Sequence, residues 1–76
     1  MYTRNTRVRH RLTRSTGRVY NIMGACPFDD SYMQSVAAVE TFGPNPMRFV
    51  NSTWYYIVRG TYFGEYVPEE LLERAT

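Results

Sequence analysis

The chain has 76 residues, of which 43% are hydrophobic, 16% aromatic and 21% charged, and its formal net charge is +2. This length fits one domain, residues 1–76, which hides only about 60% of the surface of the unfolded chain, so large side chains must supply the core. One Cys and one His exclude an internal disulfide and a zinc site within one chain, and no apolar run approaches the roughly 18 residues that span a membrane.

The first predicted element is a basic arm, residues 1–18, which carries six arginines and no acid, a local charge of +6. These arginines are Arg4, Arg7, Arg9, Arg11, Arg14 and Arg18. Residues 1–5 form the start of the arm and are expected to be flexible. Residues 19–76 carry a charge of −4, and their acids gather near the C-terminus. A basic arm on a mildly acidic body is typical of proteins that contact nucleic acid or another anion.

Apolar and basic side chains alternate along residues 6–13, and this alternation predicts a strand. Val8, His10 and Leu12 would share one face, while the intervening arginines would follow the opposite face. A helix with its arginines at i+3 and i+4 steps is the alternative, although the Thr, Ser and Gly residues of this segment disfavour it. A turn at residues 15–17 then leads into a second strand, residues 18–23.

The middle of the chain permits two interpretations. Residues 24–30 form a loop, and residues 36–42 are predicted as a strand. In the alternative, Asp29 and Asp30 cap a helix near residues 30–38, and the fold class becomes α+β. Residues 43–46, with one Gly and two Pro, are the strongest break in the chain.

The β pattern is clearest after this break. Residues 47–50, 54–58 and 62–67 are predicted as strands, with turns at residues 51–53 and 59–61. Pro68 suits the first position of a short C-terminal helix. About five short strands with brief turns predict a mainly β fold, a small antiparallel barrel.

The last third of the chain resembles the C-terminal half of SH3-like barrels, where an aromatic pair opens a strand, a glycine turn follows, and Gly-Tyr-Ile/Val-Pro leads into a short helical turn. The matching residues are Trp54, Tyr55, Val58, Arg59, Gly64, Tyr66, Val67, Pro68 and Leu71. Glu65 departs from the pattern, and the N-terminal aromatic segment that lines the peptide groove of signalling SH3 domains is missing. The resemblance, limited to residues 54–72, therefore implies a barrel rather than a particular ligand.

Aromatic residues of this segment are the candidate partner-binding residues. Trp54 and Tyr56 are expected to supply core, and the opposite face would leave Tyr55, Tyr62 or Tyr66 partly exposed. Exposed aromatic side chains anchor protein partners and stack on bases. The candidate set is Trp54, Tyr55, Tyr62 and Tyr66.

Nothing in the sequence indicates an enzyme, a cofactor or a metal site. His10 and Cys26 are the minimum of a thiol catalytic pair, but no oxyanion signature accompanies Cys26. Asp29 and Asp30 offer too few ligands for a metal cation. We therefore expect a non-enzymatic protein of the cytoplasm that has no cofactor.

The leading hypothesis is a small binding module whose basic arm contacts nucleic-acid phosphates with low sequence specificity. The alternative is a protein-binding inhibitor, or an assembly or adaptor protein of a virus or mobile element that acts in the host cytoplasm on one large protein partner. Docking of the basic arm on the acidic C-terminal helix of a second copy would give a homo-oligomer, and no membrane partner is expected. The hypotheses diverge on whether the arginines of residues 7–11 face solvent or are buried against Glu65, Glu69, Glu70 or Glu73.

Overall fold

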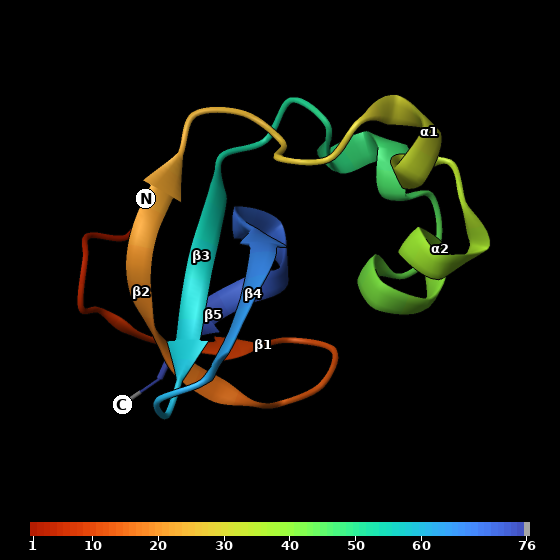
Figure 1. The fold of residues 1–76 in the computed structure, drawn as a ribbon. Helices are drawn as coiled ribbons and strands as arrows, with labels where there is room; N and C mark the ends of the chain where they lie inside the picture. Colours follow the sequence, from red (N-terminus) through yellow and green to blue (C-terminus); the bar gives the residue numbers. More distant parts are fainter. Residues whose placement is uncertain (76) are drawn as a thin grey trace.

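Five antiparallel strands form one sheet in the computed structural model, which describes residues 1–75 (Figure 1). The strands are β1 (Arg7–His10), β2 (Thr16–Met23), β3 (Trp54–Arg59), β4 (Phe63–Pro68) and β5 (Leu72–Arg74). Between β2 and β3 the chain forms an insert with helices α1 (Asp30–Met33) and α2 (Val36–Phe42) and the 3₁₀ helix η1 (Pro46–Phe49). The prediction of a mainly β fold with about five strands is confirmed. None of the helices in residues 1–75 is long and apolar enough to cross a membrane.

The strand order in the sheet is β4-β3-β2-β1-β5, so β1 lies between β2 and the last strand. In the ladders that flank β1, Arg7 lies opposite Arg18 of β2, and Arg9 lies opposite Glu73 of β5. Within the described residues no ladder joins β4 to β5, so the sheet is open and the predicted barrel does not close.

Both faces of the sheet are covered where β3 begins. Consecutive side chains of a strand point to opposite faces, yet Trp54 and Tyr55 are both fully buried. Tyr55 faces the same side as Ile57, within the core that β1, β2, β4 and β5 enclose. Trp54 faces the insert, where its ring centroid lies 5.1 Å from that of Phe42 and its Nε1 donates to the carbonyl oxygen of Phe49 at 2.8 Å.

The prediction of a strand at residues 36–42 is wrong, because this segment is helix α2. Ser35 caps the helix by accepting a hydrogen bond from the amide of Ala38 at 3.2 Å, and burial of Ala38 and Phe42 follows the i, i+4 spacing of a helix. Asp29 caps α1 in the same way, so the alternative with a helix near residues 30–38 lies closer to the structure. Residues 47–50 are also not a strand, since η1 occupies most of them.

The predicted turn and the predicted final helix both lie elsewhere. The chain turns at residues 11–14, where Arg14 has a φ of 67°, and β2 already begins at Thr16, within the predicted turn. A Cβ on Gly17 would lie 2.7 Å from Cγ2 of Ile57, so this position of β2 requires glycine. After Pro68 the chain makes a single 3₁₀ turn, η2 (Glu69–Leu71), and Leu72 already belongs to β5 because it pairs with His10.

The first residues of the arm contact the core through Tyr55. The amide of Tyr2 donates to the Tyr55 hydroxyl at 3.0 Å, and that hydroxyl donates to Glu69 Oε1 at 2.6 Å. Burial, together with the hydrogen bond to Glu69, raises the pKa of Tyr55 to about 12. Tyr55 therefore remains a neutral donor that links residues from both ends of the chain.

Candidate functional site

The arginines of the basic arm divide into two groups, and the first surrounds Glu73 on β5. Arg9 Nη1 donates to Glu73 Oε2 at 3.2 Å, while Nη1 of Arg11 and of Arg14 lies 3.7 Å and 3.6 Å from Glu73 Oε1. The hydrogen bond from Arg9 and the charges of Arg14 and Arg11 lower the pKa of Glu73. Arg11 and Arg14 are more than half exposed, whereas Arg9 is only 30% exposed, so one guanidinium of residues 7–11 is partly buried against Glu73.

The second group, Arg4, Arg7 and Arg18, makes no ion pair with any carboxylate of residues 1–75. Arg7 and Arg18 are directly opposite in the β1–β2 ladder, which places both side chains on one face of the sheet. Arg4 reaches the same strand, where its Nη2 donates to Asn21 Oδ1 at 3.3 Å. Arg18 Nη1 donates to the carbonyl oxygen of Asn5 at 3.0 Å. All three cations are exposed, and neutral groups are the only hydrogen-bond partners of Arg4 and Arg18 in the described residues.

A row of tyrosines crosses the sheet beside Arg18. Tyr56 lies opposite Tyr66 in the β3–β4 ladder with ring centroids 4.9 Å apart, and the ring of Tyr20 lies 6.2 Å from that of Tyr56. Arg18 is opposite Val58, which is two residues from Tyr56 and so shares its face. We call Arg4, Arg7, Arg18, Tyr20, Tyr56 and Tyr66 the cation–aromatic face.

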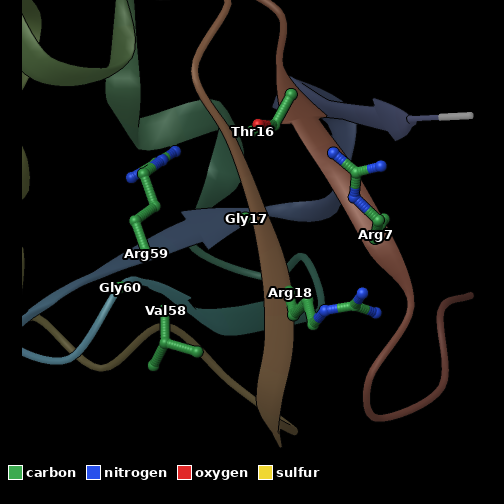
Figure 2. Close-up of a pocket in the computed structure, with 7 residues that line it drawn as sticks. All are labelled: Arg7, Thr16, Gly17, Arg18, Val58, Arg59 and Gly60. Atoms are coloured by element: carbon green, nitrogen blue, oxygen red, sulfur yellow. The ribbon is translucent and has the colours of Figure 1, made fainter.

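A depression of about 310 Å³ lies at the arginine end of this face, with no carboxylate in its lining. Its lining residues are Arg7, Thr16, Gly17, Arg18, Val58, Arg59 and Gly60. Figure 2 shows the guanidinium groups of Arg7 and Arg18 on one side of the β2 backbone and that of Arg59 on the other. Arg59 is paired through Nη1 with Glu65, so Arg7 and Arg18 are the cations of this depression that have no acidic partner.

The four aromatic residues that were predicted to bind a partner differ in how far they are exposed. Tyr55 is fully buried, so the prediction of its partial exposure is wrong, and Trp54 is buried under the insert. Neither side chain reaches the surface, and both leave the candidate set. Tyr62 is 92% exposed in the β3–β4 turn, and Tyr66 is half-buried within the tyrosine row.

Sequence reasoning missed Tyr20 and Tyr56. The signal for Tyr20 is present in the sequence, because it follows Arg18 by two residues and therefore shares its face. Tyr56 was expected in the core because alternation does not tell which face of β3 is covered. The insert covers that face at Trp54 and, through Phe28, at Tyr66, while Tyr56 remains partly exposed.

His10 belongs to a charged group on the opposite, inner side of the sheet. Its side chain is only 2% exposed, its Nδ1 accepts a hydrogen bond from the amide of Leu12 at 3.1 Å, and its Nε2 lies 3.7 Å from Glu65 Oε1. Burial lowers the pKa of His10 and Arg59 lowers it further, whereas Glu65 raises it. Both ring nitrogens of His10 thus have neighbours that hold the ring in place. Cys26 lies in the loop before α1, and burial raises the pKa of its thiol.

Comparison with known proteins gives no relative for this chain. No known family model matches it, and neither the curated proteins nor the solved structures contain a match. Metal-binding clusters of three or more His, Cys, Asp or Glu are also not found in residues 1–75. The interpretation of the cation–aromatic face therefore rests on its chemistry.

Proposed function

We propose that this protein is a non-enzymatic module that binds nucleic acid through the cation–aromatic face. The observation that carries the proposal is the row of Arg7 and Arg18, without acidic partners, beside the tyrosine row on one face of the sheet. Guanidinium groups bind phosphates as two-pronged donors, and tyrosine rings offer surfaces on which bases stack. Phosphate contacts of this kind position the protein without reading the base sequence, so specificity is low.

The two groups of arginines have different roles in this proposal. Arg4, Arg7 and Arg18 contact phosphates directly, since no acid competes for them. Arg9, Arg11 and Arg14 share Glu73, which cancels part of their charge, and they add to the field that attracts the ligand. The set of six arginines that the sequence predicts to contact phosphates is therefore narrowed to three principal contacts.

The salt dependence of binding tests this assignment. Replacement of Arg7 and Arg18 together by Gln should weaken binding of a labelled oligonucleotide and lower the slope of log K against log salt by about 1.4–1.8, because each lost phosphate contact contributes about 0.7–0.9. Filter binding at several salt concentrations measures this slope.

Arg48→Gln is the matched control, because Arg48 is exposed on η1, outside the cation–aromatic face. It should leave the slope nearly unchanged. Binding by the wild type that is absent or independent of salt would refute the proposal, as would equal slopes for the double variant and the wild type.

We also propose that the domain is SH3-like. Trp54 and Tyr55 open β3, and Val67 and Pro68 end β4 and lead directly into the short helical turn η2, as the resemblance implies. Glu65, which departs from the SH3-like sequence pattern, does not interrupt the strand. It lies on β4 and forms an ion pair with Arg59. The five short antiparallel strands, which are joined in one sheet in the order β4-β3-β2-β1-β5, support the same proposal.

A second candidate function, binding of one large protein partner, is favoured by the β3–β4 turn. Tyr62 and Phe63 are 92% and 76% exposed there, and large exposed aromatics anchor protein interfaces. An inhibitor, or an adaptor of a virus or mobile element, would use this turn. A homo-oligomer that used Glu73 would have to break the pairing of Glu73 with Arg9 within the chain. A protein captured from nuclease-treated extract by the wild type, and lost with Tyr62→Ala, would support this candidate.

A further inference from the structure

Tyr20 is a large aromatic side chain that remains 65% exposed in the middle of a strand. It lies where the register between β2 and β3 shifts, between Val19 and Asn21, so β2 has one residue more than its partner. Such a bulge redirects a side chain and increases the local twist, and bulges are common beside functional sites. The bulge places Tyr20 on the surface next to Tyr56, at the end of the tyrosine row nearest Arg4.

The other two rings extend this surface across β3 and β4. Tyr56 lies across Gly64, since a Cβ on Gly64 would collide with the ring and hydroxyl of Tyr56. Gly64 therefore allows the Tyr56 ring to lie close to the sheet instead of standing away from it. Tyr66 packs against the far side of Tyr56 with an angle of 51° between the rings, and it also contacts Phe28 of the insert, with ring centroids 5.8 Å apart. Tyr20 stands at 78° to Tyr56, so the three rings form a continuous aromatic surface, which we call the aromatic platform, rather than a single protruding ring.

An aromatic platform distinguishes between forms of nucleic acid. In a duplex each base has both faces stacked on its neighbours, so a protein ring on a sheet surface reaches only phosphates, sugars and groove edges. Unpaired bases expose their faces, and stacking on aromatic side chains is the usual way in which proteins hold them. A duplex could use Arg7 and Arg18, but it would leave the tyrosine row without a role.

We infer that the ligand of the cation–aromatic face is single-stranded DNA or RNA, with unpaired bases on Tyr20, Tyr56 and Tyr66 and phosphates at Arg7 and Arg18. This inference rests on the proposed function and names its class of ligand. The acid-free depression beside Arg7 and Arg18 lies one row from the platform, so a strand that stacks its bases on the tyrosines brings its phosphates to the depression. Charge and shape thus favour the same occupant.

The test compares one labelled oligonucleotide of about 20 nucleotides as a single strand and as a duplex with its complement, by fluorescence anisotropy at equal salt. The wild type should bind the single strand more tightly. Tyr20→Ala should weaken single-strand binding about fivefold or more while changing duplex binding less than about twofold, since the loss of stacking affects only unpaired bases. Tyr20→Phe keeps an aromatic ring and should bind the single strand within about twofold of the wild type.

Val36→Ala is the control, because Val36 is also a large exposed apolar side chain but lies on α2, outside the cation–aromatic face. Equal affinity of the wild type for the two forms, or a loss with Val36→Ala that equals the loss with Tyr20→Ala, would overturn the inference and leave the proposed function intact. Absence of binding to both forms would overturn the proposed function as well. The comparison of the two forms needs only the wild type, so it decides the inference even if Tyr20→Ala does not fold, which circular dichroism would reveal.

Discussion

Glu73 is the residue that divides the arginines of the basic arm. It lies on β5, opposite Arg9 in the ladder with β1, and its two oxygens face three guanidinium groups. Alternation along the sequence correctly predicts that the arginines of β1 avoid the core. It does not identify their acidic partner, because Arg9 and Glu73 are separated by 64 residues and only the strand order brings them together.

Replacement of Glu73 by Gln should release these arginines for an external anion. We expect the affinity for nucleic acid at low salt to rise roughly fivefold, because the net charge beside the arm increases while the cation–aromatic face is unchanged. Binding titrations of the variant and the wild type in the same buffer measure the change.

Glu70→Gln is the matched control, since it alters the net charge equally at a residue that accepts a hydrogen bond from Ser52 rather than from the arm. It should raise the affinity much less than Glu73→Gln does. Equal effects of the two variants would mean that only net charge matters and that the pairing at Glu73 does not restrain the arm.

The turn between β1 and β2 is the element that His10 supports. Nδ1 of His10 accepts hydrogen bonds from the amides of Leu12 and Thr13 at 3.1 Å and 3.5 Å, so this nitrogen must be unprotonated. The charged groups that face the ring are Glu65 of β4 and Arg59 of β3. The residues of this turn include Arg11 and Arg14, so the state of His10 affects how part of the basic arm is held.

The stability of the protein should therefore depend on pH in the range where histidine titrates. Burial lowers the pKa of His10 in the folded state below the usual value of about 6.5. At a pH between the pKa of the folded state and that of the unfolded state, the unfolded chain therefore binds more protons than the folded one. The stabilising contribution is present above the unfolded pKa and is lost as the pH falls through the folded pKa. The urea concentration at the midpoint of unfolding should therefore be lower at about pH 5 than at about pH 8.

His10→Gln removes the titrating group and should reduce the difference between these two midpoints. Carboxylates also destabilise the fold on acidification, but they titrate mostly at lower pH and act equally in both proteins. A wild-type midpoint that stays constant, or a variant with the same difference as the wild type, would contradict the prediction.

Elements with a strong local pattern could be predicted from the sequence, and the insert could not. The aromatic run predicted a strand at residues 54–58, close to the observed β3, and the alternation of Val8 and His10 with arginines predicted β1, although residues 11–13 of that predicted strand form a turn. For residues 36–42, hydrophobicity suits both a strand and a helix, and Ser35 as a cap decides for the helix. Tyr55 was placed on the wrong face because the insert covers the other face at Trp54, a long-range contact that alternation does not contain.

At the scale of the whole molecule, strand pairing brings together charged and aromatic residues that are far apart in the sequence. The arm and the aromatic segment lie in different thirds of the chain, and the sequence suggested two separate features. The ladders β1–β2 and β2–β3 bring them together, because Arg7, Arg18 and Val58 form one row and the tyrosines form the next. The candidate site is therefore a property of the strand order, which only the structure supplies.

The position of β1 between β2 and β5 has a consequence for the order of events in folding. β2 follows β1 after a short turn, but the second edge of β1 is covered only when residues 72–74 have been synthesised. A chain without these residues has no partner for the second edge of Arg7–His10 and lacks Glu73, the acidic partner of the arm. Closing contacts over so long a separation costs chain entropy and slows folding, so the basic arm of the nascent chain meets its surroundings before it meets its own acidic partner.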